Sequence, residues 1–291
     1  MDRERFIDVD GIKTRYFERG EGEPLVLVHG DNPGNRGSAE DWEGNLDGLA
    51  QAGFRVFAVD KIGCGYTDNP RRDEDYVIGS SVAHVAGFIR ALGLGPAHLV
   101  GHSRGGYTVT RLTLEHPELV RTLVIVDSSS LMTPPNPENR AREAEALALP
   151  DPRERHRYAL RVNSFAGDHI TQGWLDEILA AQALPKTALA REAWARFYPS
   201  FAVDVVARQA ETHARIRAGG ITCPTLVIWS YHDPSATMVR CGIPCMNLIL
   251  PNVPRSEMHV LTRAGHFCFR EQPEAFNAAV IDFIRRHGGV A

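Results

Sequence analysis

Short apolar runs alternate with segments of helical periodicity along most of this chain, and this alternation restricts its fold more than any other feature. The runs are nearly continuous in apolar residues, which is typical of strands covered by helices on both faces. They lie at residues 25–28, 54–59, 98–100, 123–126 and 225–229. The helical segments lie between them, at residues 42–52, 78–92 and 105–116. Strands that alternate with helices in this way predict an α/β fold with a mostly parallel sheet.

The two ends of the chain add to this pattern. Strand-like residues 6–9 and 14–18 flank Asp10-Gly11, a dipeptide that favours a tight hairpin, so the sheet should begin antiparallel. Residues 273–287 have helical periodicity and close the chain. We therefore expect helices on both faces of a sheet that is parallel except at its start.

The middle of the chain has a different character. After Asp127 comes a segment rich in Ser and Pro, and then helical periodicity without a strand until residues 221–224. The helical segments lie at residues 140–149, 151–162, 173–183 and 189–197. Ligands bind at the carboxyl end of the strands in open α/β sheets, so a helical block inserted here predicts a cap over that end. We expect a core of residues 1–131 and 218–291, with a helical cap at 132–217.

Composition excludes several classes of function. The chain has 32 Lys and Arg against 36 Asp and Glu, a net charge of −4 that favours neither nucleic acid nor an anionic membrane as partner. No apolar run approaches the roughly 20 residues of a membrane helix. The charged residues 1–5 are unlike a signal peptide, so we expect a cytoplasmic protein. The cysteines are odd in number and scattered, which is typical of free thiols, and no Cys/His set predicts a metal site.

The strongest local motif is Gly101-His102-Ser103-Arg104-Gly105. It joins the strand at 98–100 to the helix that follows, which is the setting required by the G-x-S-x-G turn of serine hydrolases. The two glycines allow strand and helix to approach closely, and the sharp turn exposes the serine hydroxyl above the sheet. The motif therefore predicts Ser103 as a nucleophile.

A serine nucleophile needs an adjacent base. His266 follows the last strand-like run and Gly265, on a loop before the final helix, where such a base is expected. His232 and His259 are alternatives that the same positional argument places lower.

The base in turn needs a carboxylate to orient it. Asp233 lies at the end of the strand 225–229, and the order Ser103, Asp233, His266 fits the fold that carries this turn. Asp127, which ends the strand after the nucleophile helix, is the alternative acid.

A tetrahedral intermediate also needs two backbone donors aimed at its oxyanion. One should be the N–H of Arg104, directly after the nucleophile. The other should come from the loop 29–34, where Pro33 has no N–H and leaves Asp31 or Asn32. We favour Asp31.

These residues together resemble the α/β-hydrolase superfamily. The resemblance covers the whole chain: the His29-Gly30 loop, the turn at 63–68, the Ser103 turn, Asp233 and Gly265-His266. Within the superfamily, residues 29–34 and 267–273 look most like the meta-cleavage-product hydrolases. Members of that family cleave a carbon–carbon bond in ring-opened aromatic dienoates.

The chain also departs from that family. The family usually has Asn before the nucleophile and Trp after the catalytic His, where this chain has His102 and Phe267. Asp41 is the nearest equivalent of a polar Asn in that family, and the family's cap arginine has no clear counterpart here. Arg191 and Arg196 are candidates, but charges on a surface helix are the commoner interpretation of such residues. Losing these groups while keeping the triad favours simpler acyl chemistry. We expect a hydrolase of an ester or lactone, and similar serine esterases that open macrolides suggest a macrolide esterase with a role in antibiotic resistance.

The cap should determine specificity. Its aromatic residues either line an apolar pocket or pack the cap's own core: Trp174, Trp194, Phe197, Tyr198 and Phe201. His102 and Phe267 should border the same pocket. The basic cluster at 153–157 is most simply a solvated helix face, with binding of an acidic substrate group as the alternative.

Three hypotheses result. The leading one is acyl transfer from a small-molecule ester or lactone to water, without cofactor or metal, in a monomer or homodimer. The second is C–C hydrolysis by the same residues, and the third is a binding protein or receptor built on the hydrolase fold.

Overall fold

The computed structural model describes residues 4–133, 141 and 144–289, and an eight-stranded sheet lies at its centre. The strand order is β1-β2-β4-β3-β5-β6-β7-β8. The strands are β1 (Glu4–Val9), β2 (Ile12–Arg19), β3 (Glu23–Val28), β4 (Phe54–Val59), β5 (Ala97–His102), β6 (Val120–Val126), β7 (Thr225–Ser230) and β8 (Ser256–Leu261). β1 and β2 pair antiparallel, β2 meets β4 antiparallel, and the pairs from β4 to β8 are parallel. The predicted α/β fold with an antiparallel start is confirmed.

The first hairpin follows directly from its two turn residues. Asp10 and Gly11 have φ angles of 51° and 80°, and Val9 faces Ile12 across the turn. Positive φ at both central positions gives a turn whose twist matches the flanking strands, and Asp-Gly tolerates it.

Helices cover both faces of the sheet. Alternate residues of β3 divide between two apolar clusters: Leu25 and Leu27 belong to one, Val26 and Val28 to the other. The first cluster packs under α1 (Glu43–Gln51) and α11 (Pro273–His287), the second under α2 (Ile78–Ala91) and α3 (Arg104–Glu115). All four β3 side chains are fully buried, which explains their unbroken apolar sequence.

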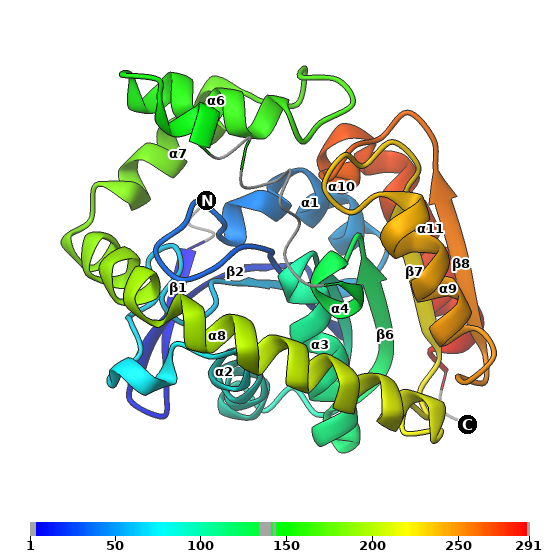
Figure 1. Cartoon of the computed structure of the whole chain (residues 1–291). Coiled ribbons are helices and arrows are strands. Elements are labelled where there is room, and N and C mark those ends of the chain that lie inside the picture. The colour runs from blue at the N-terminus through cyan, green and yellow to red at the C-terminus, as the bar shows by residue number, and fades with distance from the viewer. Residues whose placement is uncertain (1–3, 134–140, 142–143, 290–291) are drawn as a thin grey trace.

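The described residues between β6 and β7 are mostly helical. Their elements are α4 (Ser129–Met132), α6 (Pro152–Arg161), α7 (Gln172–Gln182) and α8 (Pro185–Arg217). Figure 1 shows α6 and α7 above the sheet, while α8 runs back past α3 toward β7. The helix expected at 140–149 falls partly outside the described residues.

One helix is longer than the sequence predicted. We expected a helix at 189–197, whereas α8 continues through Pro199 to Arg217. Proline removes one helical N–H and usually ends a helix. Here the residues on both sides of it, including Ala193 and Phe201, are buried against neighbouring elements, so tertiary packing outweighs the local preference.

Shorter helices complete the chain. They are the 3-10 helices Ala39–Trp42, Asp73–Asp75 and Pro117–Leu119, the π-helix Met238–Gly242, α9 (Ile243–Ile249) and α10 (Cys268–Glu271). None of the helices in the described part of the chain is both long and apolar enough to cross a membrane. The five cysteines are free thiols.

A buried ion pair joins β2 to the loop after β4. Arg15 Nε lies 2.7 Å from Asp60 Oδ2, and the two side chains are 2% and 0% exposed. Asp60 also accepts hydrogen bonds from the N–H groups of Ala39 and Tyr66 at 2.6 and 2.7 Å. Burial by itself raises the pKa of Asp60, but Arg15 outweighs it and holds that pKa below its usual range.

Arg15→Leu therefore leaves a buried charge without its partner. We expect a loss of about 3–5 kcal/mol in the free energy of unfolding, measured by urea denaturation. Arg19→Leu is the matched control, because its pair with Asp47 is exposed and should contribute at most about 1 kcal/mol. Equal urea midpoints for the two variants would contradict this assignment.

Candidate active site

The turn between β5 and α3 holds Ser103 in a strained backbone conformation. Its φ and ψ are 53° and −119°, values that non-glycine residues rarely adopt. A Cβ at Gly101 would lie 2.4 Å from the carbonyl oxygen of Gly105. Both flanking positions therefore require glycine for the strand and helix to meet, as the motif predicts.

Gly105→Ala tests this requirement. The new Cβ would lie 2.3 Å from Val28 O and 2.4 Å from His29 O, both backbone atoms that cannot move aside alone. We expect a loss of about 1–3 kcal/mol in unfolding free energy, as for other overpacked sites, together with reduced reactivity of Ser103.

The matched control is Gly44→Ala in α1, where nothing lies within 4 Å of the new Cβ. Alanine is the better helix former, so this variant should gain up to about 1 kcal/mol. Thermal unfolding of both variants gives the comparison, and a stable, fully reactive Gly105→Ala protein would contradict the steric argument.

His266 and Asp233 form a hydrogen-bonded pair at the ends of β8 and β7. His266 Nδ1 lies 2.6 Å from Asp233 Oδ2. The other carboxylate oxygen accepts from Ser235 N, Ser235 Oγ and Ala236 N at 2.7, 2.9 and 2.8 Å. These bonds fix the carboxylate, which in turn places the proton of the imidazole on Nδ1 and leaves Nε2 as the acceptor.

Electrostatics favour a charged pair. Burial lowers the pKa of His266, but the Asp233 carboxylate outweighs burial and raises that pKa above the ordinary histidine value. Burial likewise raises the pKa of Asp233, and His266 overcomes this and lowers it. The site therefore stabilises an imidazolium next to a carboxylate, the state a serine hydrolase forms when its base accepts a proton.

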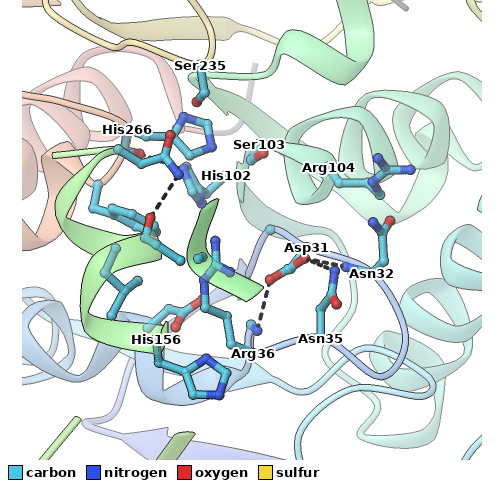
Figure 2. Close-up of a pocket in the computed structure, with 18 of the residues that line it drawn as sticks. Asp31, Asn32, Asn35, Arg36, His102, Ser103, Arg104, His156, Ser235 and His266 are labelled. Atoms are coloured by element: carbon cyan, nitrogen blue, oxygen red, sulfur yellow. Dashed lines mark hydrogen bonds between the residues drawn. The ribbon is translucent and has the colours of Figure 1, made fainter. Parts of the chain in front are cut away.

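Ser103 and His266 line the same cavity, and Figure 2 shows both beside His102 and opposite the loop of residues 31–36. The backbone N–H of His266 donates to the carbonyl of Asn163 at 2.7 Å. The histidine loop is thus fastened to the segment that follows α6.

His102 supports the His266 loop. Its Nε2 donates to the carbonyl of His266 at 2.7 Å, and the two rings lie 4.6 Å apart. Burial, and then the charge of His266, lower the pKa of His102 well below the histidine value, so the ring is neutral. Its Nδ1 is buried without a hydrogen-bond partner among the residues described. His102 lines the cavity, as expected, but its N–H is committed to the protein backbone.

The loop after β3 turns sharply at Asp31, whose φ is 65°. The Asp31 carboxylate accepts from Asn32 N, Asn35 Nδ2 and Gly37 N at 3.0, 2.7 and 3.3 Å (Figure 2). The N–H of Asn32 is therefore engaged within the loop, which favours Asp31 as the donor to an oxyanion. Arg104 begins α3, and the first N–H groups of a helix point outward from its positive end.

His29 braces this loop from below. Its Nε2 accepts the N–H of Lys61 at 3.1 Å, and its Nδ1 contacts the carbonyl of Gly30 at 2.7 Å. Burial, and next the charge of Lys61, lower the pKa of His29 to about 3, so this histidine stays neutral. The geometry suits a structural role.

A cavity of about 1170 Å³ lies above Ser103 and below the helices of the segment between β6 and β7. Of the expected substrate-binding residues, His102, Trp174, Trp194 and Phe267 line it, as do Tyr198 and Phe201. Phe197 is not among the lining residues and packs beside Tyr76, Ala190 and Ala193 instead.

This cavity is more basic than we expected from the sequence. Of the two arginine candidates, Arg191 lines the cavity, whereas Arg196 is not among the lining residues and pairs with Asp73. Five arginines line the cavity, against the two carboxylates of Asp31 and Asp41: Arg36, Arg104, Arg155, Arg191 and Arg240. Burial, followed by the charges of Arg36, Arg191 and Arg155, lowers the pKa of His156 to about 4.

Residues 153–157 belong to α6, and we interpreted them as a solvated helix face with binding of an acidic group as the alternative; Arg155 and His156 among them line the cavity. A periodic pattern identifies a polar helix face, but it does not show whether that face contacts solvent or lines a cavity.

Asp41 is the second unexpected feature. It is 5% exposed, lines the cavity, and burial raises its pKa to about 7 against the opposing charge of Arg270. Among the residues described, no group of three or more His, Cys, Asp or Glu side chains could hold a metal ion.

The family is decided by a match over most of the chain. Residues 23–273 match the model of the alpha/beta hydrolase fold family. The chain belongs to this family. As an alpha/beta hydrolase it resembles the meta-cleavage-product hydrolases, and it is a serine-dependent hydrolase.

Several relatives support this placement. A 2-hydroxy-6-oxononadienedioate/2-hydroxy-6-oxononatrienedioate hydrolase of Burkholderia vietnamiensis is 30% identical over 94% of this chain and 92% of its own length. A 2-hydroxy-6-oxo-6-(2'-aminophenyl)hexa-2,4-dienoic acid hydrolase of Metapseudomonas resinovorans is 28% identical, over 99% and 92%. The solved structure of a meta-cleavage product hydrolase from Pseudomonas fluorescens IP01 superimposes with a TM-score of 0.78 at 25% identity, covering 97% of both chains.

Proposed function

We propose that this alpha/beta hydrolase cleaves a carboxylic ester or lactone through an acyl-enzyme on Ser103. The size of the cavity carries the proposal. At about 1170 Å³ it exceeds the ligand pockets of roughly 300–1,000 Å³ that are usual for small molecules. A ring-opened nine-carbon acid would fill a small part of that space, whereas a macrocyclic lactone such as a macrolide would fill much of it.

The proposed reaction begins with attack of Ser103 Oγ on the carbonyl carbon. His266 Nε2 accepts the serine proton, while Asp233 holds the Nδ1–H and stabilises the imidazolium. The N–H groups of Asp31 and Arg104 bind the oxyanion. His266 then protonates the leaving alkoxide and activates the water that releases the acid, so no cofactor takes part.

We further propose that residues 132–217 act as a cap that determines specificity. Trp174 and Trp194 line the cavity from this segment. The Asn163 carbonyl accepts a hydrogen bond from the backbone N–H of His266, so this segment contacts the loop that carries the base. This connection supports a cap that positions both the substrate and the His266 loop.

C–C hydrolysis is the second candidate, and a specific observation favours it. The relative from Burkholderia is named for dienedioates, which carry two carboxylates. The excess of arginine over carboxylate around the cavity suits such an acidic substrate. One observation argues against C–C hydrolysis. The Nε2–H of His102 donates to the backbone carbonyl of His266 and is therefore not available to bind a dienolate.

The test is mass spectrometry of a mixed panel incubated with the wild type and with Ser103→Ala. The panel contains simple esters, macrocyclic lactones including macrolides, and ring-opened aromatic dienoates. A lactone that gains one water without fragmenting, only with the wild type, is the expected result. A dienoate split into two acids, with esters and lactones untouched, would replace this proposal by C–C hydrolysis. Tight binding without turnover of any compound would favour a binding protein.

A further inference from the structure

A carboxylate that the proposed reaction does not use joins the His266 loop to the proposed cap. Glu271, the last residue of α10, accepts the N–H of Gly265 on Oε1 at 2.8 Å. Its Oε2 accepts the N–H groups of Phe165 and Ala166, both at 2.9 Å. One carboxylate therefore binds the residue directly before the base and two residues of the segment 163–166, which follows α6.

The same two loops also touch through their backbones. A Cβ at Gly265 would lie 2.5 Å from Phe165 N, 2.6 Å from Ser164 C and 2.7 Å from Asn163 O. The φ of Gly265 is not positive, so this close approach, and not a left-handed backbone, requires glycine. Glycine at this position allows the segment 163–166 to lie against the His266 loop.

The position of this carboxylate suits an acceptor and excludes a donor. Three backbone N–H groups point at Glu271, two from the segment 163–166 and one from the His266 loop. An ionised carboxylate only accepts hydrogen bonds, and bonds to a charged acceptor are stronger than those between neutral groups. Glutamine has the same size, but its amide would turn an NH₂ toward at least one of the three donors.

α10 gives the carboxylate a rigid support. Cys268 and Phe269 are fully buried. Arg270 Nη1 donates to two backbone carbonyls of the 3-10 helix Ala39–Trp42, at 2.8 and 2.9 Å. Glu271 therefore projects from a turn that is fixed to the core, and the segment 163–166 is held against it.

The segment 163–166 continues directly from the wall of the cavity. α6 ends at Arg161, and Ala159, Leu160 and Asn163 are among the residues that line the cavity. A substrate that contacts α6 therefore contacts the same stretch of chain that Glu271 holds against the His266 loop.

We propose that Glu271 is a positioning residue for His266, because it holds the segment 163–166 against the loop that carries this base. The inference rests on the proposed reaction of Ser103 and His266. With the segment in contact, Glu271 binds the N–H before His266, Asn163 binds the N–H of His266 itself, and His102 binds its carbonyl.

Loss of Glu271 removes part of this support. The N–H of Gly265 loses its acceptor, and the segment 163–166 loses the hydrogen bonds of Phe165 and Ala166. His266 is then free to shift relative to Ser103. A misplacement of about 1 Å can lower a rate by about 10²-fold, so a positioning residue of this kind should have a measurable effect on the reaction.

The first test is the rate at which a fluorophosphonate labels Ser103 in Glu271→Gln. We expect labelling about 10- to 100-fold slower than in the wild type, with the wild-type circular dichroism spectrum. Glu257→Gln is the matched control, because its carboxylate lies on the strand that leads to the same loop but pairs with Arg286 and His287 of α11. This control should label at the wild-type rate. Equal rates for the two variants would overturn the proposal.

A second test separates positioning of the base from a general effect on the fold. Glu271→Gln is combined with His266→Ala, and residual labelling is followed over long exposures to the fluorophosphonate. Residues that act as a unit are strongly non-additive, so the double variant should label within about twofold of His266→Ala alone. A further tenfold loss in the double variant would mean that Glu271 acts independently of His266, and would refute its positioning role.

Gly265→Ala opens the same contact without removing a hydrogen-bonding group, and it keeps the proposal testable if Glu271→Gln does not fold. Its Cβ collides with the backbone of Ser164 and Phe165, so we expect labelling to slow about 10- to 100-fold here too. Wild-type labelling by Gly265→Ala would contradict the role of this contact. Undiminished labelling of Ser103→Ala would instead refute the underlying reaction.

Discussion

Replacing Ser103 with alanine is expected to lower kcat by about 10⁴- to 10⁶-fold, the range seen when the nucleophile of a serine hydrolase is removed. Ser103 Oγ is the protein atom that bonds to the substrate carbon in the proposed reaction, before water releases the acid. Alanine fits the same strained turn, since the strain at a φ of 53° belongs to the backbone and both flanking glycines remain. The protein should therefore stay folded, as circular dichroism and urea denaturation would show.

The measurement is kcat on an ester or lactone that the wild type turns over. Ser80→Ala is the matched control, because Ser80 lies in α2 and is not among the residues that line the cavity. That variant should keep the wild-type kcat. A Ser103→Ala protein that retains kcat within about tenfold would remove Ser103 from the mechanism, since nucleophiles contribute far more than this.

His266→Ala is expected to lower kcat by a comparable factor, about 10³- to 10⁶-fold, because Ser103 then has no base. The loss should be accompanied by reduced stability, since Asp233 is left as a buried carboxylate without its partner at 2.6 Å. His259→Ala is the matched control, because His259 is exposed on β8 and was an alternative base by sequence. Equal losses in the two variants would contradict the assignment of His266.

The pH dependence of the wild type follows from the same pair. Asp233 outweighs burial and raises the pKa of His266 above its usual value of 6.5. The free base is the active form, so kcat/KM should fall as the pH drops through a midpoint above 6.5. A midpoint below 6.5 would mean that burial, rather than Asp233, dominates at this histidine.

Much of this architecture could be predicted from the sequence because its signals are local. Strands such as β3 are buried on both faces, so their apolar runs are visible without any tertiary information. The turn at Ser103 requires two glycines at fixed spacing, and each makes a backbone contact that excludes a side chain. Asp233 and His266 could be placed together because adjacent parallel strands bring their carboxyl ends to one edge.

Most of the charge of the cavity could not be predicted in this way, although Arg191, a candidate from the sequence, does line it. Arg36 lies in a loop and Arg155 in a polar helix, and both patterns are equally compatible with solvent. Only the packing of α6 over the sheet turns Arg155 inward. Phe197 on α8 is an opposite case: we expected this aromatic residue to line the cavity, but it packs beside Tyr76 instead. The length of α8 was missed because Pro199 is tolerated through contacts that lie far apart in the sequence.

The central claim is that Ser103 acts as a nucleophile activated by His266. Intact-protein mass spectrometry after brief exposure to a fluorophosphonate tests it most directly. The wild type should gain the mass of one phosphonyl group, which peptide mapping places on Ser103, and Ser103→Ala should gain none. An unlabelled wild type, or equal labelling of the two proteins, would contradict the claim.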